Sequence, residues 1–180
     1  NSSHVDIELI DPVVNPTKVD DLIHKVTKKY GGEVKKYEGF LDTYPGQYAK
    51  ISTFAKDQAA KVNGLPFQEI KTQDLAETVL ITVSTVQGFP KVLEQGKIRI
   101  DRQLKAKPPD YKGATESIKS TMSNLSEMLA RIIDDFKADK DNAKVPEAIR
   151  KYMAASLTQY EQTKKLADGI VDQIGKLGEL

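Results

Sequence analysis

The chain has 180 residues, no cysteine and no tryptophan, and its 27 Lys and Arg nearly balance its 26 Asp and Glu, for a net charge of +1. The lack of cysteine excludes disulfides and thiolate zinc sites. The balanced charge gives no basis for nucleic-acid binding, which needs a concentrated basic face. The length suits one domain with a sizeable core, and we expect a single helical-bundle domain over 1–180.

Residues 1–15 carry no sustained hydrophobic period and are predicted to form an extended arm. After Asn15-Pro16-Thr17, where Thr17 can cap a helix, apolar side chains recur at alternating steps of three and four, which is typical of an amphipathic helix. This stripe consists of Val19, Ile23, Val26, Tyr30, Val34, Tyr37, Leu41, Tyr44, Tyr48, Ile51, Ala55, Val62 and Leu65. One of its positions, Gln58, is polar. The helix is predicted to end at Gly64, with a weak spot at Gly31-Gly32 and a kink or break at Pro45-Gly46.

A second helix is predicted from about Thr72 to the Pro108-Pro109 pair. Its stripe consists of Leu75, Val79, Val83, Val86, Leu93, Ile100 and Leu104. The register continues across Gly88-Phe89-Pro90, where a kink is expected. Because β-branched residues are frequent over 78–86, a hairpin over 78–101 is the alternative. A hairpin would have no other strands to pair with, so the continuous register favours a helix.

Two more regular helices complete the predicted fold. The third spans about 114–138, and the fourth begins at Pro146, a favoured first helical residue, and reaches Leu177. The short polar turns between the helices favour antiparallel neighbours. We therefore predict an all-α protein, an elongated antiparallel four-helix bundle whose first two helices are kinked or broken, with five to six helical segments if they break.

No motif in the sequence supports catalysis or a cofactor. Asp21 and His24 have the i, i+3 spacing of di-iron bundles, but such sites need that motif on two helices. The run that begins at Asp139 resembles a calcium loop but has Lys144 and Arg150 where glycine and glutamate are needed. The glycines lack the spacing of a phosphate loop. We therefore expect a protein that is not an enzyme and uses no cofactor or metal.

The apolar stripe and its tyrosines remain as candidates for binding. Core-side tyrosines need a partner or a route to water for their hydroxyls. They either lie at the margin of the bundle or line a cavity that accepts an amphiphile such as a fatty acid, with lysines near its head group. All three expected backbone breaks fall in the first half of the chain, so we place the candidate ligand-binding residues there. They are Tyr30, Tyr37, Tyr44, Tyr48, Val79, Val83, Val86 and Phe89.

A bundle of this size that lacks cysteine and tryptophan and is rich in lysine resembles the exchangeable apolipoproteins of insects, the apolipophorin III class. It is also similar to small secreted helical lipid carriers of fungi and nematodes. The resemblance covers helix layout and composition over the whole chain, and it implies a lipid or fatty acid as ligand. No individual residue is carried over from it.

The location and the alternative functions follow from weaker patterns. No apolar run has the roughly 20 residues needed to span a bilayer. The chain begins at Asn1 instead of methionine, and Asn1 and Asn124 stand in glycosylation sequons, so we expect a secreted protein. The leading hypothesis is a hydrophobic-ligand or lipid-binding protein. The alternatives are a helical rod, of the coiled-coil or antigen type, that binds a protein partner, and a pore-forming component in which 78–93 detaches.

Overall fold

The computed structural model describes the backbone of residues 16–177 and the side chains of residues 35–177. It divides into two compact units, Asn1–Gly39 and Phe40–Leu180, and each is described by itself. In the first unit the described backbone is helical, and Lys36 Nζ lies 6.0 Å from the centre of the Tyr37 ring. The predicted arm at 1–15 lies outside the described residues, and the expectation of a single domain stays a prediction.

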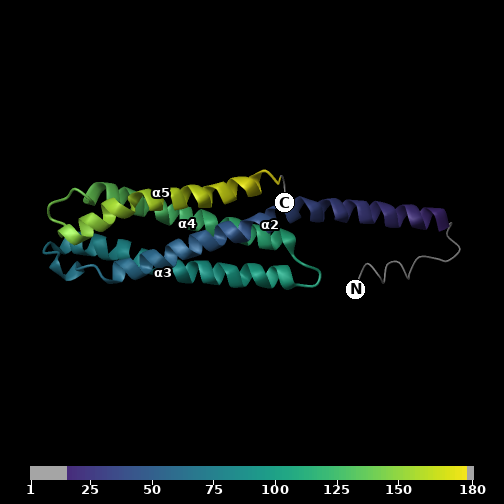
Figure 1. Ribbon diagram of the computed structural model, residues 1–180. Helices are drawn as coiled ribbons and strands as arrows, with labels where there is room; N and C mark the ends of the chain where they lie inside the picture. Colours follow the sequence, from purple (N-terminus) through teal and green to yellow (C-terminus); the bar gives the residue numbers. More distant parts are fainter. Residues whose placement is uncertain (1–15, 178–180) are drawn as a thin grey trace. The chain divides into compact units, whose positions relative to one another are not determined.

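Helices make up most of the described chain (Figure 1). They are α2 (Pro16–Asn63), the short 3-10 helix η1 (Phe67–Glu69), α3 (Gln73–Lys105), α4 (Tyr111–Asp139) and α5 (Glu147–Gly175). Residues 16–177 contain no strand. The all-α class is therefore confirmed, and the segment 78–101 is helix and not a hairpin.

Local signals account for most of the helix ends. Helix α2 stops one residue before Gly64, and α3 begins one residue after Thr72. The carboxylate of Asp110 accepts a hydrogen bond from the Gly113 backbone N–H at 2.9 Å, which satisfies one of the free donors in the first turn of α4. Pro146 immediately precedes α5, where its missing N–H costs no helical hydrogen bond.

Two helices contain an interior proline and continue through it. Pro45 lies inside α2 and Pro90 inside α3. Each proline lacks the N–H that would bond to the carbonyl four residues earlier, but the neighbouring turns keep the helix intact. A kink or a break was predicted at each of these two positions, and no break occurs. The bundle therefore has four long helices.

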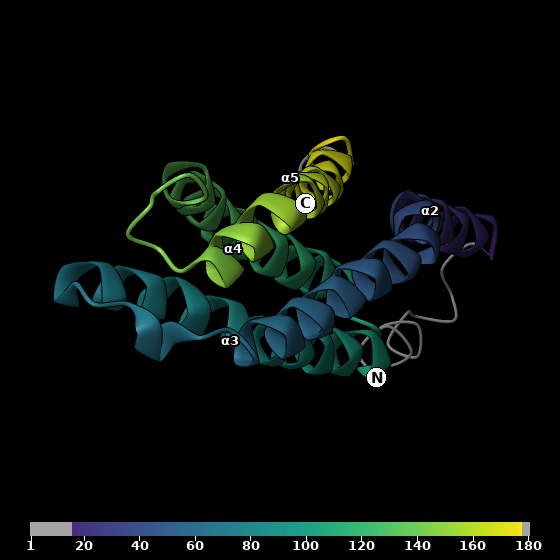
Figure 2. The same ribbon diagram turned by 60° about the vertical axis from the view of Figure 1, so that its left-hand side comes forward.

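The four helices of the second unit alternate in direction around a closed ring (Figure 2). For each pair of neighbouring helices, two contacts show that residue numbers rise along one helix where they fall along the other. These contacts join Tyr48 to Leu93 and Asn63 to Gln87, Thr82 to Asp135 and Ser117 to Gln103, Ser126 to Asp168 and Lys137 to Glu161, and Phe54 to Tyr160 and Gln58 to Tyr152. The predicted antiparallel up-and-down bundle is confirmed.

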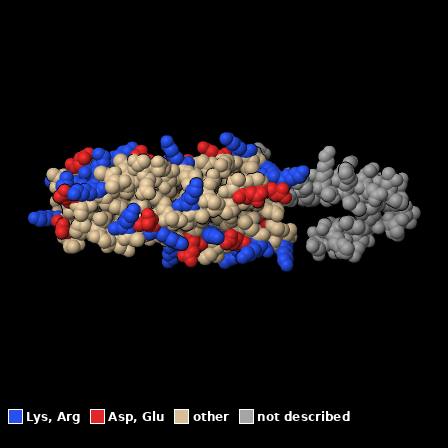
Figure 3. Space-filling model, viewed as in Figure 1, with Lys and Arg blue, Asp and Glu red and all other residues tan. Residues whose placement is uncertain are grey.

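Apolar side chains from all four helices fill the interior of this bundle. Phe54, Phe136 and Tyr160 meet edge to face at its centre, with ring centres 4.9 Å apart in both pairs that include Tyr160. Helix α4 packs closely against both α3 and α5. Lysines and arginines are mixed with acidic residues over the visible surface (Figure 3).

Candidate functional site

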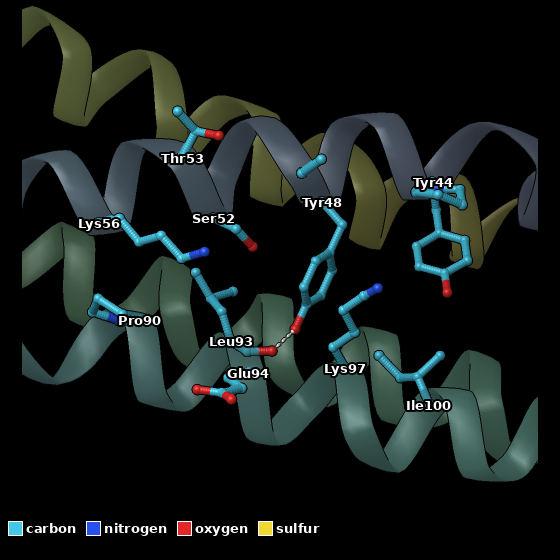
Figure 4. Close-up of a pocket in the computed structure, with 12 residues that line it drawn as sticks. Tyr44, Tyr48, Ser52, Thr53, Lys56, Pro90, Leu93, Glu94, Lys97 and Ile100 are labelled. Carbon is cyan, nitrogen blue, oxygen red and sulfur yellow. Dashed lines mark hydrogen bonds between the residues drawn. The ribbon is translucent and has the colours of Figure 1, made fainter.

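A groove of about 490 Å³ lies between α2 and α3 on the surface of the second unit (Figure 4). The wall from α2 consists of Tyr44, Pro45, Tyr48, Ala49, Ser52, Thr53 and Lys56. The wall from α3 consists of Pro90, Leu93, Glu94, Lys97 and Ile100. Both interior prolines of the bundle therefore border the groove.

Apolar and aromatic side chains form the floor of the groove. Tyr44, Tyr48, Leu93 and Ile100 are all buried, with at most 7% of any of them exposed. Their positions follow from the helical period, since residues four or seven apart lie on the same face of a helix. Phe40 extends the aromatic row, with its ring stacked on that of Tyr44 at 5.7 Å between centres. The floor is thus continuous with the bundle core.

The side chain of Tyr48 crosses from α2 to α3. Its hydroxyl donates a hydrogen bond to the Leu93 carbonyl (Figure 4). Burial, reinforced by the neighbouring Tyr44, raises the pKa of Tyr48 to about 12, although Arg99 opposes the shift. The hydroxyl is therefore held in its protonated form, and the ring acts as a strut that sets the spacing between the two helices.

Gly96 makes room for this strut. A methyl group at Gly96 would lie 2.9 Å from the Tyr48 hydroxyl oxygen and 2.9 Å from Cγ2 of Thr121 on α4. These are shorter than ordinary van der Waals contacts, so any larger residue would push Tyr48 or Thr121 away. Gly96 was not among the residues predicted from the sequence. The sequence hint to Gly96 was a gap in the apolar stripe, which steps by seven residues from Leu93 to Ile100 and has no apolar residue at 96 or 97.

Charged side chains line the rim above the apolar floor. The Lys97 ammonium lies 3.8 Å from the Asp101 carboxylate, one turn further along α3. Lys56 has no ion-pair partner among residues 35–177. Glu94, the one carboxylate in the lining, projects from the α3 wall, across from Lys56 (Figure 4). The groove therefore combines an apolar floor with two cations and one anion.

The structure separates the residues that the sequence suggested for binding. Tyr44 and Tyr48 line the groove, whereas Tyr37 belongs to the first unit and the side chain of Tyr30 lies outside the described residues. The apolar residues proposed on the second helix all lie in the bundle core. They are Val79, Val83, Val86 and Phe89, each at most 7% exposed. The three valines border a void of only about 10 Å³, about the room that one water needs.

A polar cluster lies within the apolar core, apart from the groove. Gln58 is fully buried, and its Oε1 accepts a hydrogen bond of 2.7 Å from the Tyr152 hydroxyl, which lies 2.7 Å from the Tyr160 hydroxyl. Burial raises the pKa of both tyrosines, so both stay protonated. The Nε2 of Gln58 has no partner within the described residues. The polar gap in the first hydrophobic stripe is thus a core position.

Two other kinds of site are absent from the described residues. No group of three or more His, Asp or Glu side chains at 35–177 is placed to hold a metal ion. Within the same part of the chain, no helix combines the length and the apolar character needed to cross a bilayer. Leu80, Ile81 and Ile98 are exposed on α3, and exposed apolar side chains are common at protein surfaces.

The chain matches no protein-family model, no curated protein and no solved structure. No activity, ligand or residue role can therefore be transferred to it from a relative. The groove and the chemistry of its lining carry the functional argument.

Proposed function

We propose that this protein is a non-enzymatic binding protein that holds a small hydrophobic or amphiphilic molecule in the α2–α3 groove. The observation that carries the proposal is the groove itself, with its volume of about 490 Å³ and its floor of Tyr44, Tyr48, Leu93 and Ile100. Small-molecule pockets typically enclose about 300–1,000 Å³ and combine a mainly apolar lining with a few polar groups. The groove fits both descriptions.

The composition of the lining supports binding without chemistry. General acid and base catalysis relies most often on histidine, and otherwise on groups such as carboxylates positioned against the reacting atoms. The twelve lining residues include one carboxylate, that of Glu94, and no histidine. The Tyr48 hydroxyl is already engaged by the Leu93 carbonyl and has a raised pKa, so it is a poor base near neutral pH. We therefore propose a carrier or sensor role for the groove.

A neutral fluorescent amphiphile, the amide of dansyl-labelled undecanoic acid, tests this proposal. We expect the wild-type protein to bind it and Ala49→Trp to lose most of the affinity, because Ala49 lines the groove and an indole would fill it. Ala155→Trp is the matched control, since Ala155 is also an exposed helical alanine but lies on α5 outside the groove. Absence of binding by the wild type, or equal loss in both variants, would contradict the proposal.

The earlier alternatives gain less support. A pore-forming role would require 78–93 to leave the bundle, but this segment contributes Val79, Val83, Val86 and Phe89 to the core. A protein-binding rod and a location outside the cell remain predictions from the sequence. Asn124 of the second sequon is exposed on α4, but the next two residues, Leu125 and Ser126, are buried.

A further inference from the structure

The α2 wall of the groove changes in character along the helix. Its first part consists of Tyr44, Pro45, Tyr48 and Ala49, which offer apolar and aromatic surface. Its last part consists of Ser52, Thr53 and Lys56. The Ser52 hydroxyl and the Lys56 ammonium project towards α3, whereas the Thr53 side chain projects away from it (Figure 4). Such a division suits a ligand with an apolar body and a polar end, because each part of the ligand then meets matching groups.

The polar end of the groove presents one cation that no other described group neutralises. Ser52 and Lys56 are one helical turn apart on α2, so their side chains share a face. Figure 4 shows both pointing into the groove, with the Lys56 ammonium above Leu93. Within residues 35–177, no carboxylate lies within ion-pair distance of Lys56, whereas Lys97 already has Asp101 at 3.8 Å.

We propose that the ligand is an amphiphilic carboxylic acid, whose carboxylate binds the Lys56 ammonium and the Ser52 hydroxyl and whose apolar chain lies over Tyr48 towards Tyr44 and Ile100. This inference rests on the proposed binding function and adds the chemical class and the orientation of the ligand. A hydrogen bond between charged partners is stronger than one between neutral partners, so Lys56 is expected to favour the acid over a neutral analogue.

Glu94 suggests the alternative ligand, an amphiphilic amine, and this alternative can be tested. Its carboxylate belongs to the same lining and would attract an amphiphilic amine and repel an acid. Glu94 projects from the opposite wall, however, and lies three residues before Lys97 on α3, where the two side chains are helical neighbours. Lys56 is the ionised group that accompanies the Ser52 hydroxyl on the α2 wall, which is why the acid is favoured.

The test compares three dansyl-undecyl probes that differ only in their end group, a carboxylate, a carboxamide and an amine, by fluorescence titration at neutral pH. The wild type is expected to bind the acid about tenfold more tightly than the amide, a difference of about 1.4 kcal/mol. Lys56→Gln is expected to abolish this preference while it keeps its affinity for the amide. Lys97→Gln, the matched loss of a charge in the same groove, is expected to retain most of the preference.

Each other outcome has a distinct meaning. If no probe binds, the proposed function fails together with this inference. If the wild type binds acid and amide equally, or the amine most tightly, binding stands but the acidic ligand is wrong. If Lys97→Gln abolishes the preference and Lys56→Gln does not, the orientation of the ligand is overturned. Thermal unfolding of both variants verifies that they fold, as expected for exposed lysines.

Discussion

The buried faces of α2 and α4 are built from different side chains, and the groove follows from that difference. Between residues 40 and 48, α2 buries the rings of Phe40, Tyr44 and Tyr48. Helix α4 buries mainly aliphatic and small residues, such as Leu125 and Leu129, and packs closely against α3 and α5. A ring reaches further than an aliphatic chain, and we infer that the aromatic side leaves a groove between α2 and α3 for this reason, whereas the aliphatic side closes.

The sharpest test of this contrast uses the same truncation on both sides. Leu129→Ala and Leu93→Ala both remove a nearly fully buried leucine. Such changes cost about 2–5 kcal/mol, with the larger costs where a closed cavity is left. We expect Leu129→Ala to lie in the upper half of this range and Leu93→Ala in the lower half, because Leu93 borders a groove that water already reaches. Urea unfolding measures both, and equal costs would contradict the contrast.

The variant Gly96→Ala tests how firmly the Tyr48 side chain is fixed between α2 and α3. Gly96→Ala is expected to destabilise the protein by about 1–3 kcal/mol, because the new atom would lie 2.9 Å from Tyr48 and Thr121. Gly88→Ala on the same helix is the control, since no atom lies within 4 Å of a methyl group there. The control should gain up to about 1 kcal/mol from helix propensity. A stabilised Gly96→Ala would show that the strut is mobile.

Removal of the Tyr48 hydroxyl should have a smaller effect. Tyr48→Phe loses one buried hydrogen bond, which contributes about 0.5–1.5 kcal/mol. The pKa of Tyr48 is raised to about 12, above its ordinary value of 10.0, so its contribution is complete below pH 10 and is lost as the pH rises towards 12. Wild type and Tyr48→Phe should therefore converge in stability in alkali. A constant difference between them across that range would exclude the linkage.

The weakest effect on stability is expected for Asp168, on the side of the bundle where α4 packs against α5, and it depends on acidic pH. The Ser126 hydroxyl on α4 donates a hydrogen bond to the Asp168 carboxylate on α5, which also accepts one from Lys164, one turn earlier on α5. Burial alone would raise the pKa of Asp168, but these bonds and the Lys164 charge outweigh it and lower the pKa. Its contribution is thus present above the unfolded pKa and is lost as the pH falls through the folded one.

Because Asp168 is 44% exposed, Asp168→Asn should cost less than about 1 kcal/mol at neutral pH. Wild type and variant should converge in acid, which unfolding at pH 7 and pH 3 measures. Lys151→Gln, which breaks a more exposed pair with Glu147, is the control and should change little at either pH.

The sequence predicted the helices well because their signals are local. Gly64, Thr72 and Pro146 mark ends that the structure places within one residue. The hairpin alternative arose from the β-branched residues of 78–86, whose preference for strands is weak where an amphipathic stripe continues through them. The interior prolines suggested breaks, but packing in the bundle keeps both helices whole.

Only part of the site could be predicted, because a groove is formed by two helices, whereas a sequence pattern describes one helix at a time. The four-residue spacing of Tyr44 and Tyr48 indicates a shared face but not whether the facing helix fills the space between them. Val79 and Val83 show the same periodicity and lie in the packed core. Ser52 and Lys56 continue the face of Tyr44 and Tyr48, but they are polar and give no hydrophobic signal, so their relevance appears only when α3 is placed opposite them.

Gln58 has a consequence for how the helices find their register. If α2 slid by one heptad along α5, its apolar residues would again meet apolar partners, but the Gln58 amide would lose the Tyr152 hydroxyl and be buried without it. An unsatisfied buried polar group costs about 1–3 kcal/mol. The amide thereby penalises slipped pairings that a purely apolar stripe would tolerate, as single buried asparagines do in coiled coils. Gln58→Leu should therefore fold, but into a bundle with less uniquely aligned helices.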